Sequence, residues 1–182
     1  MNGNIKRFII VAFLMLLLLI LAVFLMPAAE GEAKEIPEPT FEERVQAMIR
    51  EHKIMTERLI AAWEHQREEI NLLAEVIYHE NWYTDKEHMA AYYTGAVVMN
   101  RVRSGAWPDT VKAVLYQKGQ YSTTKYFYTK ELPAEVYEMA RDIYKNGTPE
   151  VPYNVVYQAT FEQGYGDWGD PINGEHFCFG RA

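Results

Sequence analysis

The stretch from Leu72 to Thr123 decides the fold, and it reads LLAEVIYHENWYTDKEHMAAYYTGAVVMNRVRSGAWPDTVKAVLYQKGQYST. It opens with an apolar run of helical spacing, which predicts a helix that ends among the aromatic residues 78–83. A second run of helical spacing covers residues 91–102 and stops at Ser104-Gly105, where glycine commonly caps a helix. A short third helix is expected to start at Trp107–Thr110. The order of these runs predicts a mainly helical domain.

A single carboxylate, Glu80, stands at the end of the first of these helices. Its neighbours in the chain are aromatic: Tyr78, His79, Trp82 and Tyr83. Burial among such rings disfavours the charged form of a carboxyl group and raises its pKa. A carboxyl group that stays protonated near neutral pH can act as a general acid. Glu80 is therefore the leading catalytic candidate.

The N-terminal segment predicts a membrane anchor. Residues 8–26 form an unbroken apolar run of 19 residues, close to the roughly 20 that cross a bilayer as a helix. Lys6 and Arg7 precede it, and glutamates follow it, so the N-terminus is expected inside and the bulk of the chain outside. Residues 1–26 are thus interpreted as a single-pass transmembrane helix or an uncleaved signal. The alternative is a signal peptide cleaved near Gly31, which would release a secreted protein.

The rest of the chain divides into three parts. Residues 27–40 contain three prolines and are expected to form an extended linker. Residues 41–69 have the spacing of an amphipathic helix that begins at a capping box, Thr40 with Glu43, and that either pairs with itself or lies against the domain. Residues 70–182 form the catalytic domain, with a further helix from Pro133 and two strands near the C-terminus. The fold class is α+β: a mainly helical domain with a small antiparallel β element.

Composition and motifs exclude several classes of function. The formal net charge is −7, so no basic surface for nucleic acid is expected. The single cysteine, Cys178, allows no internal disulfide and lies between two phenylalanines, which favours a core position. His79-Glu80 begins a zinc-protease pattern, but Tyr83 stands where its second histidine belongs. We therefore expect no metal and no cofactor.

Five short motifs occur in order, each weak alone and fairly specific together. They are Leu73-Ala74-x-x-Ile77-Tyr78-x-Glu80, Gly95-Ala96-Val97-Val98-Met99-Asn100-Arg101-Val102, Trp107-Pro108-Asp109-Thr110-Val111, Tyr116-Gln117-x-Gly119-Gln120-Tyr121-Ser122, and Gly174-Glu175-His176-Phe177. This set resembles the cell-wall hydrolase family that includes the spore cortex-lytic enzymes. The resemblance implies a fold similar to lysozyme-like lytic transglycosylases, peptidoglycan as substrate, and Glu80 as the catalytic acid/base. Where the family commonly reads Glu-Ala-Arg-Gly-Glu, this chain has Glu80-Asn81-Trp82-Tyr83-Thr84 and lacks the second glutamate.

Several polar and aromatic side chains are candidates for binding the glycan. The candidate substrate-binding residues are Gln120, Tyr121, Asn100, Tyr78, Trp82 and Gln158. The amides of Gln120, Asn100 and Gln158 suit N-acetyl and hydroxyl groups, although Asn100 fits a role in bracing a loop equally well. Tyr121 is expected to orient an oxocarbenium-like intermediate or to pack.

Three functions remain open at the level of the sequence. A lytic transglycosylase cleaves the MurNAc-GlcNAc bond with one acid/base, because the 6-hydroxyl of the sugar supplies the nucleophile and closes a 1,6-anhydro ring. A hydrolytic muramidase needs a second carboxylate, and Asp85 and Glu87 are the nearest in sequence. A non-catalytic envelope protein would bind glycan strands and use the helix at 41–69 as a scaffold. We expect the transglycosylase.

Overall fold

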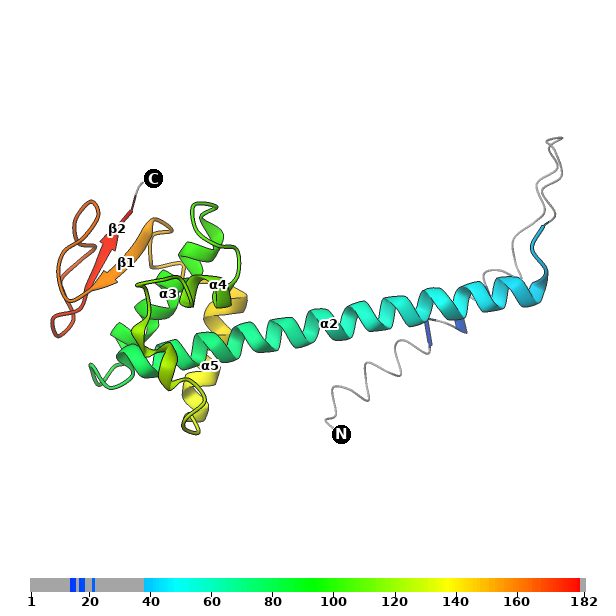
Figure 1. Ribbon diagram of the computed structural model, residues 1–182, viewed down its shortest axis with the longest axis horizontal. Coiled ribbons are helices and arrows are strands. Elements are labelled where there is room, and N and C mark those ends of the chain that lie inside the picture. The colour runs from blue at the N-terminus through cyan, green and yellow to red at the C-terminus, as the bar shows by residue number, and fades with distance from the viewer. Residues whose placement is uncertain (1–13, 16, 19–20, 22–37, 181–182) are drawn as a thin grey trace. The chain divides into compact units, whose positions relative to one another are not determined.

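The computed structural model describes residues 14–15, 17–18, 21 and 38–180 (Figure 1). Most of the predicted anchor at 8–26 and all but the end of the predicted linker at 27–40, with the cleavage site near Gly31, lie outside the described residues. Among the residues that are described, no helix has both the length and the apolar character needed to cross a membrane. The chain divides into two units, residues 1–61 and residues 62–182.

Helix α2 covers Phe41–Asn81 and is the longest element. Its start is the predicted capping box: the Thr40 amide donates to Glu43 Oε2 at 2.7 Å, and the Glu43 amide donates to Thr40 Oγ1 at 3.3 Å. The two runs predicted as an amphipathic helix to about Glu69 and a helix from Leu72 are one helix. The reason is that residues 41–81 contain neither glycine nor proline, so no residue type interrupts the backbone hydrogen bonds.

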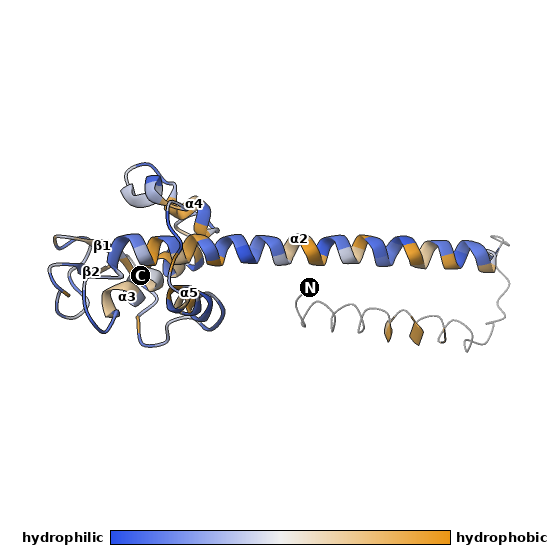
Figure 2. Ribbon diagram, turned by 90° about the horizontal axis from the view of Figure 1, so that it is seen from below, coloured by the Kyte–Doolittle hydropathy of each residue, from blue (hydrophilic) through white to orange (hydrophobic). Residues whose placement is uncertain are grey.

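The described part of the first unit consists mainly of the N-terminal stretch of α2, residues 41–61. Apolar side chains such as Ile49, Met55 and Leu59 are exposed there. Figure 2 shows hydrophobic and hydrophilic residues alternating along this stretch. The predicted self-association of residues 41–69 stays a prediction.

The second unit buries its apolar side chains between the C-terminal stretch of α2 and three shorter helices. These are α3 (Met89–Arg103), α4 (Val111–Leu115) and α5 (Ala134–Asn146), with the 3-10 helix η1 (Ser122–Tyr126) between α4 and α5. Gly95 of α3 lies where helices approach most closely. A Cβ at this position would lie 2.7 Å from Ile143 Cδ1 of α5 and 3.0 Å from Ile77 Cδ1 of α2. Glycine therefore permits this contact between the three helices.

Two antiparallel strands complete the second unit. Strand β1 (Val155–Ala159) pairs with β2 (His176–Phe179), with Gln158 opposite Phe177 and Ala159 opposite His176. The sheet is attached to α3 by side chains: Asn100 Nδ2 donates to the carbonyls of Pro152 (2.9 Å) and Val155 (3.0 Å). The prediction of a mainly helical domain with a small antiparallel β element near the C-terminus is confirmed.

Candidate active site

Glu80 lies one residue before the end of α2, where side chains from two other segments reach it. The hydroxyl of Thr123, in η1, donates a hydrogen bond to Glu80 Oε1. Glu175, just before β2, is close enough for its charge to raise the pKa of Glu80, and the charge of Glu80 in turn raises the pKa of Tyr121. The site therefore joins the end of the long helix to η1 and to the loop that leads into β2.

The environment of Glu80 favours the protonated form of its carboxyl more than water does. Burial is the largest influence and raises the pKa of the Glu80 carboxyl above its ordinary value. The hydrogen bond from Thr123 stabilises the charged form and lowers the pKa of Glu80, while the negative charge of Glu175 raises it. The net pKa of Glu80 is raised, in the direction that general acid catalysis requires.

Tyr121 and Gln120 are held by the buried guanidinium of Arg101, a residue of α3. The Arg101 Nη1 group donates to Gln120 Oε1 at 2.9 Å, and its Nε donates to the Val156 carbonyl at 2.6 Å. The Arg101 guanidinium also lies over the ring of Tyr121, 5.5 Å from the ring centroid. Tyr121 is buried, and its hydroxyl has no hydrogen-bond partner within the part of the chain that the structure describes. Burial raises the pKa of Tyr121, so this hydroxyl stays a donor.

The other two predicted amide ligands have different positions. The side-chain NH2 of Asn100 is used for the two backbone carbonyls of the β1 segment, so Asn100 braces a loop. Gln158 lies on β1, and its Oε1 atom is buried without a hydrogen-bond partner among the described residues. The structure thus assigns Asn100 a bracing contact and leaves Gln158 with an unpaired acceptor.

The aromatic residues around Glu80 do not form one uniform wall. The indole of Trp82 is buried and stacks on the ring of His88, with the centroids 3.8 Å apart. The Tyr78 hydroxyl lies 3.4 Å from that of Tyr83, and Tyr83 is 75% exposed. Tyr83 therefore does not bury the carboxyl group, contrary to our expectation, because it follows the end of α2 and projects into solvent. The direction of the pKa shift of Glu80 agrees with the prediction.

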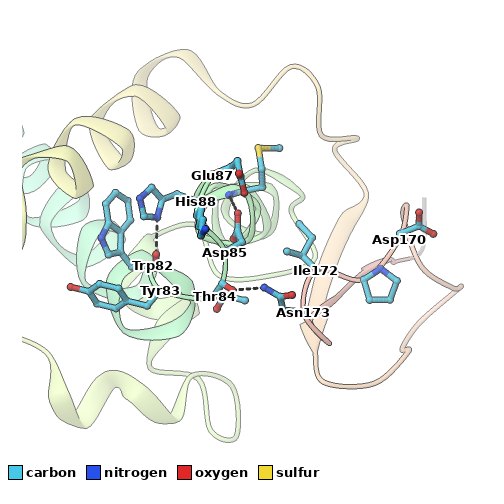
Figure 3. Close-up of a pocket in the computed structure, with 12 residues that line it drawn as sticks. Trp82, Tyr83, Thr84, Asp85, Glu87, His88, Asp170, Ile172 and Asn173 are labelled. Atoms are coloured by element: carbon cyan, nitrogen blue, oxygen red, sulfur yellow. Dashed lines mark hydrogen bonds between the residues drawn. The ribbon is translucent and has the colours of Figure 1, made fainter.

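A cleft of about 840 Å³ opens between the α2–α3 loop and the loop before β2 (Figure 3). One wall is residues 82–89 and the other is residues 170–173. The Asn173 amide group donates to the Thr84 carbonyl and connects the two walls, as Figure 3 shows. Neither Glu80 nor Glu175 lines the cleft, although each lies two residues along the chain from one of its walls.

Asp85 and Glu87, the sequence candidates for a second carboxylate, both line this cleft. Asp85 accepts hydrogen bonds from the amides of Met89 (2.7 Å) and Ala90 (3.0 Å), so it stabilises the N-terminus of α3. Glu87 is exposed. Glu175 shifts the pKa of Glu80, and neither Asp85 nor Glu87 has a comparable effect.

Sequence reasoning missed three residues of this site: Thr123, Glu175 and Arg101. Each lay inside or directly beside a motif: Arg101 within Asn-Arg-Val, Thr123 after Gly-Gln-Tyr-Ser, and Glu175 within Gly-Glu-His-Phe. That position in the motifs was the available signal. No group of three or more His, Cys, Asp or Glu side chains that could hold a metal ion occurs among residues 38–180. A partly buried carboxyl group at a helix end, next to a hydroxyl donor and a second carboxylate, is an arrangement suited to acid–base cleavage of a glycosidic bond.

Comparison with known proteins agrees with that class of site. Residues 86–171 match the family model described as Cell Wall Hydrolase. The predicted resemblance to a cell-wall hydrolase family is confirmed over these residues, and at the family level it supports an enzyme that acts on peptidoglycan. No curated protein and no solved structure shows a significant match. The matched range contains Gln120 and Tyr121 and begins six residues after Glu80, so the role of Glu80 stays a prediction.

Proposed function

We propose that this protein is a lytic transglycosylase that cleaves the MurNAc-GlcNAc bond of peptidoglycan, with Glu80 as the single acid/base. The observation that carries the proposal is the partly buried Glu80 carboxyl, whose raised pKa favours the protonated form. Thr123 donates to Oε1, which leaves Oε2 as the oxygen that holds the acidic proton. The family match over residues 86–171 supports the substrate class.

The reaction proceeds in two proton transfers. Glu80 gives its proton to the glycosidic oxygen as the bond to the anomeric carbon breaks, which leaves an oxocarbenium-like centre on the muramyl sugar. The ionised Glu80 then takes the proton of the sugar's 6-hydroxyl, whose oxygen bonds to the anomeric carbon. The products are a 1,6-anhydro-muramyl end and a free GlcNAc hydroxyl, and Glu80 is protonated again. No second carboxylate is needed.

The neighbouring groups have defined parts in this proposal. The Thr123 hydroxyl stabilises the carboxylate that forms in the first transfer. The Tyr121 hydroxyl is buried, so we propose that the Tyr121 ring packs beneath Arg101 and supports the site without contacting the sugar. Gln120 and the partly exposed Gln158 are the amide residues proposed to bind N-acetyl or hydroxyl groups. The adjoining glycan is proposed to occupy the cleft between residues 82–89 and 170–173.

A hydrolytic muramidase is the second candidate, and one observation favours it. The charge of Glu175 acts on Glu80, so the site holds a second carboxylate that could activate water. In this reaction Glu80 gives its proton to the glycosidic oxygen as the bond to the anomeric carbon breaks. Glu175 takes a proton from water, whose oxygen bonds to the anomeric carbon, and the product has a reducing end. The two mechanisms differ in the role of Glu175 as well as in their products.

The test is a digestion of purified peptidoglycan with the full chain, followed by mass spectrometry of the products. Anhydro-muramyl ends in the wild type and in Glu175→Gln are expected. Reducing ends that disappear in Glu175→Gln would establish the muramidase instead. If the folded protein binds glycan but gives no product, the non-catalytic scaffold is the remaining candidate. In that case Glu80→Gln and the wild type should bind glycan equally.

The proposed location follows from the substrate and the N-terminal sequence. We propose that residues 8–26 anchor the chain in the cell membrane and that the catalytic domain lies outside, where peptidoglycan is found. Fractionation of cells that express the full chain tests this proposal: the protein should stay with membranes after a high-salt wash. Recovery of a soluble form that starts near Gly31 would show cleavage and secretion.

A further inference from the structure

A buried ionisable pair, Glu75 with His79, lies on α2 in the five residues before Glu80 and has no part in the mechanism above. Glu75 is 1% exposed, and the side chain of His79 is 9% exposed. Glu75 Oε2 and His79 Nε2 lie 3.3 Å apart. Burying two ionisable groups costs free energy unless each has polar partners. The other contacts of Glu75 and His79 therefore indicate what role the pair has.

Both side chains face the C-terminal end of η1 and the residues just after it. The backbone N–H of Tyr128, whose φ is +60°, lies close enough to the Glu75 carboxyl to lower its pKa, against the larger effect of burial. That φ lies in the left-handed region, which residues other than glycine adopt at a cost when their surroundings fix it. The His79 ring stacks on Phe127, with the centroids 5.9 Å apart, and lies 6.2 Å from the ring of Tyr126. The pair therefore holds residues 126–128 against α2.

Residues 126–128 are joined to Thr123 through the short turns of η1. The Thr124 amide donates to the Tyr121 carbonyl at 3.4 Å, and the Phe127 amide donates to the Thr124 carbonyl at 3.3 Å. Thr123 lies within these turns and donates to Glu80. Helix α2 thus contacts this segment twice: Glu75 and His79 hold its end, and Glu80 receives the hydroxyl from its start.

We propose that Glu75 and His79 are positioning residues that hold residues 126–128 on α2 and thereby keep the Thr123 hydroxyl on Glu80. For its effect on catalysis, the inference rests on the proposed function. The effect on the pKa of the Glu80 carboxyl does not depend on the proposed function, and it can be measured without any substrate.

The direction of the effect on Glu80 separates this role from a direct effect of charge. The hydrogen bond from Thr123 lowers the pKa of Glu80, so releasing Thr123 raises that pKa. Removing a negative charge at Glu75 would act directly on Glu80 in the opposite direction and lower its pKa. The titratable groups that interact with Glu80 are Glu175 and Tyr121. Those that interact with Glu75 are His79, Tyr128 and Tyr137 of α5.

The experiment is an NMR titration of the Glu80 side-chain carboxyl carbon in the full chain, labelled with 13C-glutamate. The signal is assigned by its loss in Glu80→Gln. Glu75→Leu removes the acceptor for the Tyr128 amide and should raise the pKa of Glu80. Glu75→Gln removes the same charge but keeps an acceptor oxygen for the Tyr128 amide, so it should not raise that pKa. Thr123→Val should raise the pKa of Glu80, and adding Glu75→Leu to it should give no further rise.

Glu69 supplies the matched control, since it is a second buried glutamate of α2. It is 3% exposed and accepts the backbone amides of Val111 (2.7 Å) and Lys112 (3.3 Å) at the start of α4. Glu69→Leu therefore removes a comparable acid and comparable hydrogen bonds without touching residues 126–128. It should destabilise the domain and leave the pKa of Glu80 unchanged. If Glu75→Leu does not fold, His79→Ala takes its place and should raise the pKa of Glu80.

Three results would overturn the inference: an unchanged or lowered pKa of Glu80 in Glu75→Leu and His79→Ala, an equal rise in Glu69→Leu, or an added rise of Glu75→Leu on top of Thr123→Val. Peptidoglycan cleavage is the second measurement. Glu75→Leu should reduce kcat roughly tenfold, with KM within about twofold of wild type, because the hydroxyl that stabilises the Glu80 carboxylate is displaced while the substrate-binding groups are kept. A raised pKa without any cleavage in the wild type would refute the proposed function alone.

Discussion

The two ends of helix α2 have the same backbone structure and opposite environments. In residues 41–61, apolar side chains such as Ile49 and Leu59 are exposed, whereas Leu73, Val76 and Ile77 near the other end are completely buried. The N-terminal stretch is stabilised by local features, its capping box and the helix propensity of its residues. The C-terminal stretch is stabilised by packing, and it alone carries the three buried or partly buried glutamates, Glu69, Glu75 and Glu80. Continuity of a helix therefore says little about how its parts contribute to stability or function.

The largest effect is expected at the C-terminal end of α2, from Glu80→Gln. The substitution preserves size and an acceptor oxygen for Thr123 but removes the transferable proton. Peptidoglycan cleavage should fall by roughly 10²–10⁴-fold, the usual contribution of a general acid. The measurement is the release of soluble glycan fragments, with a denaturation curve to show that the variant is folded. Cleavage at the wild-type rate would place the acid elsewhere.

A large effect on stability is expected where α3 meets the C-terminal stretch of α2. Gly95→Val would place atoms within 3.0 Å or less of Ile143 Cδ1 and Ile77 Cδ1, so both isoleucines or the helices must move. Overpacking of this kind costs roughly 1–3 kcal/mol. Urea denaturation of the full chain measures it. A variant as stable as wild type would mean that α2, α3 and α5 are packed less tightly than the structure shows.

The raised pKa of Glu80 also predicts how stability depends on pH. Because the folded state holds this proton more tightly than the unfolded chain, stability falls as pH rises from the ordinary value of a glutamate through the pKa of Glu80 in the folded protein. Glu80→Gln does not titrate. Its stability relative to wild type should therefore increase with pH across this window and be level above it. A relative stability that decreased with pH would mean that the pKa of Glu80 is lowered.

The smallest effect is expected in the N-terminal stretch. Leu59 is 46% exposed, so Leu59→Gln should change the free energy of unfolding by less than about 0.5 kcal/mol. Cleavage of peptidoglycan should be unchanged. A loss above about 1 kcal/mol that depends on protein concentration would show that residues 41–69 associate, and the contrast between the two ends of α2 would then hold only for the monomer.

Much of the fold was predictable because the signals were local. The capping box at Thr40, the helix break at Ser104-Gly105 and the alternating residues before Gly180 each depend on neighbours in the sequence, and the structure has the expected elements there. The joining of two predicted helices into α2 was missed because an amphipathic pattern and a buried pattern were treated as separate elements. Both patterns are compatible with one continuous α-helical backbone.

The site was predictable only in part because its contacts join distant residues. Glu80 could be identified from its aromatic setting and motif, but Thr123 is 43 residues away and reaches Glu80 only because η1 folds onto the end of α2. The bracing contact of Asn100 depends on carbonyls more than 50 residues away. Trp82 and Tyr83 are adjacent in sequence and have opposite exposures, which depends on the direction that the chain takes after Asn81.

The environment of Cys178 has a consequence for the chemical reactivity of the whole molecule. Its thiol donates to Asp167 Oδ1 at 3.0 Å, and burial together with this carboxylate raises its pKa to about 11. Oxidants and alkylating reagents attack thiolates, so a thiol that keeps its proton at neutral pH reacts slowly. The only sulfhydryl of the chain is thereby shielded from cross-linking one copy to another, even in an oxidising compartment.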